Sequence, residues 1–201
     1  MKKYMLFVIL LLAEACIWNP QVFHPGLGNS GYRVSRQGQV ELGLQGYLFI
    51  PAFGRLTWAP VNRLNFSIGG GLTGTDSGGF QLAVNWLALN NKKTYLVFSP
   101  NVVTHKYQDK YSGVTLSLGI TAGLKVSRVF NLYLNVLAGR YQGTHLYNGD
   151  AGEGDLFNIG FGFGFDFGTV RLNAEMNLPI HSRFGDTDYL PFIGLSIYFD
   201  L

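Results

Sequence analysis

The sequence predicts an all-β fold, an antiparallel up-and-down transmembrane β-barrel, with ten strands as the favoured count and eight as the alternative. Three observations support this prediction. Apolar residues alternate with small or polar ones at period two, short and long connections alternate along the chain, and charged residues make up only 13% of the composition. A soluble domain typically has about 25% charged residues, so something other than water is expected to cover part of this surface.

The N-terminal segment has the three parts of a secretory signal. Lys2 and Lys3 precede an apolar run from Met5 to Ala13, and small residues follow this run. The run is far shorter than the roughly 20 residues that a membrane-spanning helix needs. Residues 1–15 are therefore expected to be a signal peptide that is removed on export.

Cys16 is the only cysteine of the chain and directly follows Ala15, where a lipoprotein signal peptidase would leave an acylated N-terminus. This position favours lipidation, and ordinary cleavage after Ala13-Glu14-Ala15 is the alternative. One acyl chain holds a membrane only weakly, so the lipid would add to a barrel that is already inserted. Residues 16–36 show no alternation and are expected to form a lipidated tether before a barrel of residues 37–201.

The strands are predicted from the alternation. The clearest run has phenylalanine or isoleucine at each odd position from Phe157 to Phe165, with glycine, asparagine or aspartate following each of them. In a soluble sandwich this pattern separates core from solvent, whereas in a membrane barrel it separates lipid from lumen. The predicted strands are 39–49, 55–59, 63–72, 80–89, 94–104, 114–126, 130–141, 156–166, 170–178 and 190–201.

Two predicted strands are irregular. The segment 55–59 is about half as long as the roughly 9–11 residues of a membrane strand, and eight strands follow if it pairs differently. Pro100 interrupts the strand 94–104. Because proline has no backbone N–H, a bulge or a missing ladder bond is expected there.

The connections after the first hairpin alternate in length, as in outer-membrane barrels. Short turns are predicted at 60–63, 90–93, 127–129 and 167–169, and longer loops at 73–79, 105–113, 142–155 and 179–189. Several aromatic residues near the short turns share the apolar face of their strands. They predict a ring of aromatic side chains at the membrane interface, an aromatic girdle, and the alternative is that they are core aromatics of a soluble sandwich. They are Trp58, Trp86, Phe130, Phe165 and Phe199.

Several segments of the N-terminal third carry a family resemblance. They are Cys16, Asn19-Pro20, Pro25-Gly26-Leu27, Gln37-Gly38-Gln39-Val40-Glu41-Leu42 and Leu56-Thr57-Trp58-Ala59-Pro60-Val61-Asn62-Arg63-Leu64. Here the chain resembles a group of small lipoprotein barrels common in Bacteroidota outer membranes. The resemblance implies a barrel in an outer membrane. Some relatives of such proteins are accessory subunits of larger outer-membrane machines. The resemblance therefore implies the expectation that this chain docks on such a complex.

Charged residues of lumen parity are expected to pair inside the barrel, since they would be costly in lipid. They are Glu41, Lys125, Arg171 and Glu175. A small pore is the rival interpretation, because glycines on the same face leave space for water, a loop or the tether. These glycines are Gly69, Gly71, Gly160, Gly162 and Gly164.

No catalytic, cofactor or metal site is predicted. A solvated polar loop is the favoured interpretation of His181, Ser182, Asp186 and Asp188, and a hydrolytic cluster is the alternative. His105 is expected to be a surface residue. The acidic stretch Asp150, Glu153 and Asp155 lacks the spacing of a calcium-binding loop.

The expected function is therefore that of a non-enzymatic outer-membrane lipoprotein, a structural barrel or an accessory subunit of a larger envelope complex. Its expected partners are outer-membrane lipids and other outer-membrane proteins. Nucleic acid is not expected, because the formal charge is only +3 and the basic residues form no stripe. A narrow passive channel and a rim-located lipid or peptide hydrolase are the alternatives.

Overall fold

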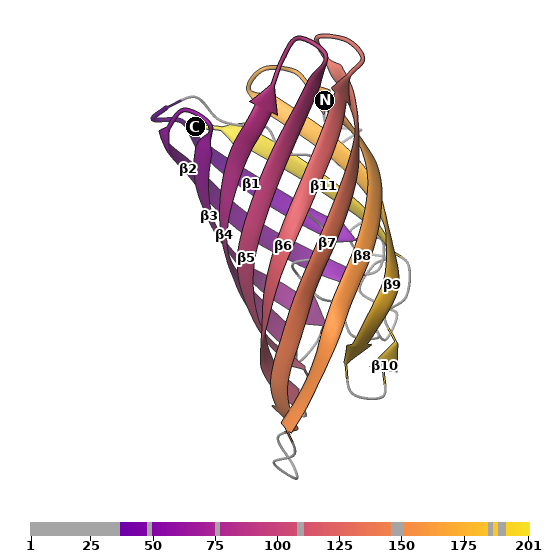
Figure 1. Cartoon of the computed structure of the whole chain (residues 1–201). Helices are drawn as coiled ribbons and strands as arrows, with labels where there is room; N and C mark the ends of the chain where they lie inside the picture. Colours follow the sequence, from indigo (N-terminus) through magenta and orange to yellow (C-terminus); the bar gives the residue numbers. More distant parts are fainter. Residues whose placement is uncertain are drawn as a thin grey trace, which may run out of the picture.

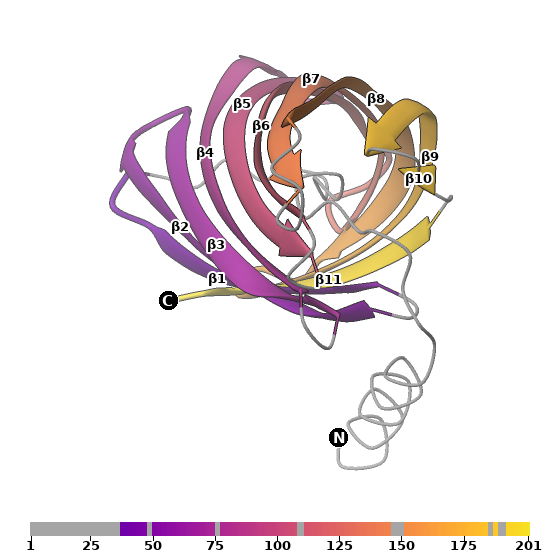
Figure 2. The same cartoon turned by 90° about the horizontal axis from the view of Figure 1, so that it is seen from below.

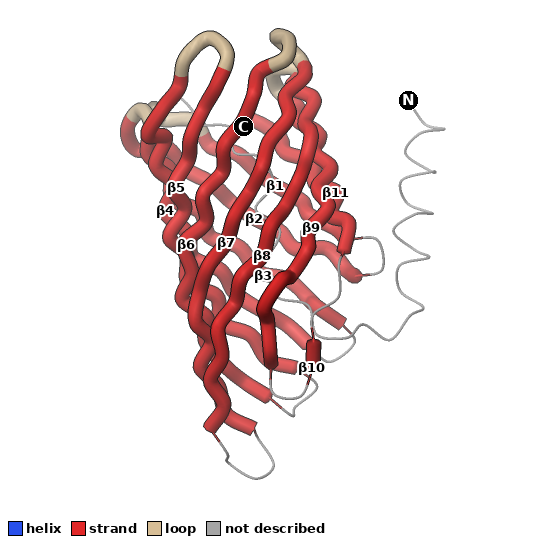
Figure 3. The backbone as a smooth tube through the Cα atoms, turned by 45° about the vertical axis from the view of Figure 1, so that its right-hand side comes forward, coloured by secondary structure: helices blue, strands red, loops and turns tan. Residues whose placement is uncertain are grey.

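The computed structural model describes residues 37–47, 50–74, 77–107, 111–145, 151–184, 187–188 and 192–201. The regular elements in these residues are β-strands (Figure 3). They are β1 (Val40–Tyr47), β2 (Ile50–Val61), β3 (Leu64–Gly74), β4 (Ser77–Asn90), β5 (Thr94–Tyr107), β6 (Tyr111–Lys125), β7 (Phe130–His145), β8 (Ala151–Asp166), β9 (Val170–Phe184), β10 (Thr187–Asp188) and β11 (Phe192–Asp200). In the same residues, no helix has the length and apolar character needed to cross a membrane.

The strands form a closed antiparallel barrel (Figure 1, Figure 2). Consecutive strands from β1 to β9 pair with one another, and β11 lies between β9 and β1. The two-residue β10 pairs with β9 and takes no part in closure. The predicted all-β barrel of ten strands is confirmed, and the eight-strand alternative is wrong.

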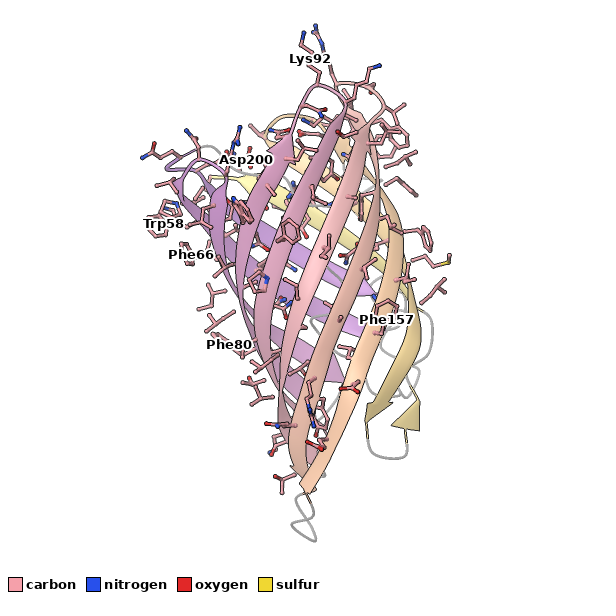
Figure 4. All side chains as sticks on the ribbon, in the orientation of Figure 1. Trp58, Phe66, Phe80, Lys92, Phe157 and Asp200 are labelled. Carbon is pink, nitrogen blue, oxygen red and sulfur yellow. The ribbon has the colours of Figure 1, made fainter. Side chains whose placement is uncertain are left out.

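The last long strand closes the barrel against the first. The register pairs Glu41 with Asp200, and the amide of Leu201 donates to the carbonyl oxygen of Val40 at 2.9 Å. Because the number of barrel strands is even, residues Val40 and Asp200 lie at the same end of the barrel as the short turns. Lys92, in one of these turns, and Asp200 both lie toward this end in Figure 4.

β2 is much longer than predicted. It has 12 residues in place of the five of segment 55–59. Gly54 is paired on both sides, with Leu44 of β1 and with Gly70 of β3. A glycine weakens the apolar alternation without interrupting the ladder when both neighbouring strands supply partners, which is why the sequence pattern understated this strand.

Pro100 interrupts one of the two ladders of β5. Pairing with β6 is continuous and places Pro100 opposite Leu118. On the other edge, pairing with β4 stops after Asn101 and resumes in the same register at Phe98. Of the two predicted irregularities, the missing ladder bond is confirmed and no bulge occurs at Pro100. A register shift lies nearer the short turn, between Leu87 and Leu89.

The connections opposite the short turns contain more strand than predicted. The predicted loops 73–79, 105–113, 142–155 and 179–189 are partly strand. β7 continues to His145 and β8 begins at Ala151, for example, and the two pair from Thr144 opposite Ala151 onward. Beyond the apolar belt the outward side chains become polar, so alternation disappears although backbone pairing continues.

Side-chain oxygens stabilise the short turns. The Asn91 Oδ1 atom accepts hydrogen bonds from the amides of Lys93 and Thr94 at 2.9 and 2.7 Å. Ser127 Oγ accepts one from the amide of Phe130 at 2.9 Å. Asn, Asp and Ser favour turns because their side chains replace backbone acceptors in this way.

Candidate functional site

The outer wall of the barrel is apolar. Along β6 the exposed side chains include Val114, Leu116, Leu118 and Leu124, with Leu116 exposed to 60%. Trp58, Phe66 and Phe80 likewise project outward from β2, β3 and β4 (Figure 4). An apolar surface that continues around a barrel is suited to the hydrocarbon of a bilayer and is unlike the surface of a soluble monomer.

The predicted aromatic girdle residues all lie on the outer face, near the short turns. Trp58 and Trp86 are exposed to 51% and 54%. The ring of Trp86 stacks on Phe98 with centroids 5.8 Å apart, and Phe130 contacts Phe165 at 5.1 Å. Phe199, on β11, is partly exposed on this face. Their contact with lipid headgroups stays a prediction.

Two of the four predicted lumen charges form a buried ion pair. The Arg171 Nη2 atom donates to both carboxylate oxygens of Glu41 at 2.9 and 2.8 Å. The guanidinium also lies over the ring of Tyr198, 4.4 Å from its centroid. Arg171 and Glu41 come from β9 and β1, which β11 separates, so the pair spans three strands of the closed barrel.

The other two predicted lumen charges lie elsewhere along the strands. Lys125 is at the short-turn mouth, where its Nζ atom donates to the side-chain oxygen of Asn90 and to the carbonyl oxygen of Asn91. Glu175 is buried on the lumen face of β9. Sequence reasoning missed Arg55, which is buried on β2. Arg55 occupies a position of β2 that alternates with the outward apolar residues, and this alternation could have identified it as a lumen residue.

Tyrosine rings fill the space that lumen glycines leave. A Cβ atom at Gly162 would lie 2.2 Å from the Cζ atom of Tyr133, and one at Gly123 would lie 1.9 Å from the Cζ atom of Tyr95. At Gly164 the corresponding position is filled by the side chains of Asn131 and Asn173. The expectation that Gly162 and Gly164 leave open space is therefore wrong, because cross-strand side chains occupy it.

The middle of the lumen is packed with polar side chains. Thr57 and Ser67 share a hydrogen bond of 3.0 Å, and Ser117 donates to the side chain of Asn101 at 2.9 Å. Several neighbouring lumen residues have no exposed surface at all. They are Asn65, Asn85, Val97, Ser99, Thr115, Thr121, Asn135, Leu137 and Asn158. The middle of the lumen is therefore tightly packed at these positions.

The rim candidates are only partly described. His181 and Ser182 lie on β9, with their backbones paired to Phe157 and Leu156. Asp188 lies on β10, and His105 lies on β5 opposite Gly79 and Gly113. Asp186 and Asp150 lie outside the described residues.

The acidic stretch is engaged in an ion pair on the outer face. Glu153 accepts a hydrogen bond from Arg140 at 2.7 Å, and both side chains are largely exposed. Within the described ranges, no cluster of His, Cys, Asp or Glu side chains has the arrangement of a metal site. The predicted signal peptide 1–15, the predicted lipidation site Cys16 and the predicted tether 16–36 lie outside these ranges.

No family model matches the sequence. No curated protein matches it either. Solved structures show a likeness of fold at low identity. A loop L8 deletion mutant of OmpT, an outer membrane protein of Vibrio cholerae, is 12% identical with a TM-score of 0.41, over 94% of this chain and 72% of that chain.

Two porins give similar values. The KdgM porin is 9% identical with a TM-score of 0.39, over 80% of this chain and 98% of that chain. The NanC porin is 14% identical with a TM-score of 0.38, over 81% of this chain and 99% of that chain. At these identities and TM-scores the likeness carries no argument about function, which must come from the geometry of this chain.

Proposed function

We propose that this chain is a non-enzymatic β-barrel of an outer membrane, and that it serves as a structural component or as an accessory subunit of a larger envelope complex. One observation carries the proposal, the combination of an apolar outer wall with a filled lumen. A filled lumen favours a structural or accessory role over a narrow passive channel. The outer wall and the two rims of the barrel are the surfaces that remain available for interaction.

The accessory-subunit proposal is tested by purification from native membranes in mild detergent, followed by mass spectrometry. We expect a stoichiometric outer-membrane partner to co-purify with the tagged chain and to be absent when an unrelated tagged barrel is purified from the same membranes. Recovery of the bare barrel alone would contradict the accessory role and would favour the structural one.

The filled lumen is tested by conductance in planar bilayers. The wild-type barrel is expected to give no discrete conductance steps. A Tyr95→Ala, Tyr133→Ala double variant removes the rings that lie over Gly123 and Gly162 and is the matched control for a widened lumen. Steps from the wild-type barrel would show that a narrow passive channel is the better interpretation.

The proposal includes an N-terminal lipid at Cys16, which rests on the position of this cysteine after Ala15. Metabolic labelling with a radioactive fatty acid checks it. Label is expected in the wild-type chain and should be lost in Cys16→Ser, whereas the barrel itself should still insert, because the strands and not the acyl chain hold it in the membrane. Equal labelling of both chains would rule out acylation at Cys16.

A further inference from the structure

A cavity of about 560 Å³ opens at the short-turn end of the lumen. We call this cavity the vestibule. Its walls come from the short-turn ends of β4 to β9 and from the turn after β6. Leu87 and Tyr95 line it and belong to a buried apolar cluster that also contains Val97 and Tyr133.

The lining of the vestibule is strongly cationic. It contains Lys92, Lys125 and Arg128 against a single carboxylate, Asp166, and it also contains Arg171, whose charge is paired with Glu41. The hydrogen bonds of the Lys125 ammonium go to two neutral oxygens, which leave its charge uncompensated. Like charges gathered around a concave, partly desolvated space raise the local concentration of anions.

Arg171 supplies a second and independent observation. It is exposed to only 4%, and its ion pair with Glu41 uses the Nη2 atom. Its Nε and Nη1 atoms are buried and have no hydrogen-bond partner among the described residues. Buried guanidinium donors are normally satisfied. Arg171 therefore brings to the wall of the vestibule two donors that the described residues leave without an acceptor.

We propose that the vestibule binds a small soluble oxyanion, a molecule that carries a phosphate or a carboxylate group. Either group accepts hydrogen bonds from ammonium and guanidinium donors, and Lys125 and Arg128 supply such donors in the lining. Lys92 and Arg128 are exposed at the mouth and attract the anion, while Lys125 contributes charge deeper in the wall. The volume of the vestibule lies within the range of small-molecule pockets, roughly 300–1,000 Å³. In an outer membrane, the short turns face the periplasm and the anion would enter from there.

The test is isothermal titration of the folded full-length barrel, in an uncharged detergent at low ionic strength, with inorganic phosphate and separately with citrate. We expect saturable one-site binding of at least one of them, weakened by added sodium chloride because the mouth charges are screened. The Lys92→Gln, Arg128→Gln double variant should bind about tenfold more weakly, as expected for the loss of two exposed charge contacts.

The matched control is the Lys93→Gln, Arg63→Gln double variant. It removes the same charge from short turns at the same end of the barrel, and neither residue lines the vestibule. Its affinity should equal that of the wild type. Phosphate binding alone would identify a phosphate site, and citrate binding alone a carboxylate site. Binding of neither probe, or equal weakening in both double variants, would overturn the proposal.

Discussion

Arg171 is a charged side chain in the interior of the barrel, and the groups around it stabilise its buried charge. Glu41 accepts two hydrogen bonds from it, and the ring of Tyr198 lies against the guanidinium. Taking two charges out of water is expensive, so a buried pair adds little stability over an apolar replacement, whereas losing one partner leaves an uncompensated charge. The pair should therefore be sensitive to substitution on one side.

Glu41→Gln should destabilise the barrel by about 3 kcal/mol, because Arg171 would keep its charge without a counterion. The measurement is a urea titration of the barrel in liposomes. Glu153→Gln is the matched control, since it breaks the exposed pair with Arg140, and exposed pairs contribute about 0–1 kcal/mol. Equal losses in the two variants would show that Glu41 and Arg171 are not paired in a desolvated lumen.

The close approach of Tyr133 to Gly162 gives a second test at the residue scale. Gly162→Ala should lower the free energy of unfolding by about 1–3 kcal/mol, because the new Cβ would overlap a packed aromatic ring. Gly152→Ala is the control, as no atom lies within 4 Å of a Cβ at that position. In a double-mutant cycle, Tyr133→Ala should remove most of the cost of Gly162→Ala. Additive losses would contradict the contact.

At the scale of the element, each strand is a two-sided surface whose faces meet different surroundings. On β6 the outward residues are large and apolar, while Thr115, Ser117 and Thr121 face the lumen and are buried. The same alternation was visible in the sequence. Strand length was less visible, because pairing continues at both ends into residues whose outward side chains are no longer apolar.

A charge placed on the outward face of β6 should act according to its depth in the membrane. Leu118→Arg, near the middle of the strand, should destabilise the barrel in liposomes by about 2–4 kcal/mol, and Leu124→Arg, beside the short turn, by about 0–1 kcal/mol. Both residues are exposed on the outer face. Urea titration in liposomes measures the difference. Equal and small effects would indicate that this face does not lie in hydrocarbon.

At the scale of the whole molecule, stability comes from closure. β11 pairs with β9 on one edge and with β1 on the other, so the ring of barrel strands has no open edge. Backbone groups in a bilayer have no water to bond, and a closed ladder satisfies them all. Opening such a ring requires many hydrogen bonds to break together.

This closure predicts heat-modifiable migration on a denaturing gel. Without boiling, the barrel should resist the detergent and run as a compact species, and boiling should shift it to the position expected for the unfolded chain. A sample unfolded in urea before loading is the control and should run at the boiled position. Identical migration of boiled and unboiled samples would contradict a closed barrel.

The sequence by itself determined the fold class, the parity of each strand and the approximate positions of the short turns, because these depend on local alternation and on turn-forming side chains such as Asn91 and Ser127. It also identified Glu41 and Arg171 as lumen residues, since a charge on that parity cannot face lipid. It understated β2 at Gly54 and the outer hairpins, where the local pattern weakens while pairing persists.

The tertiary structure alone decided how the lumen is filled. Arg171 meets Glu41 only because closure places β9 and β1 on either side of β11, 130 positions apart in sequence. The rings of Tyr95 and Tyr133 fill the positions beside Gly123 and Gly162 only in this register. The vestibule likewise brings together cationic side chains from separate turns. These contacts depend on strand order and register around a closed ring, which a local sequence pattern does not encode.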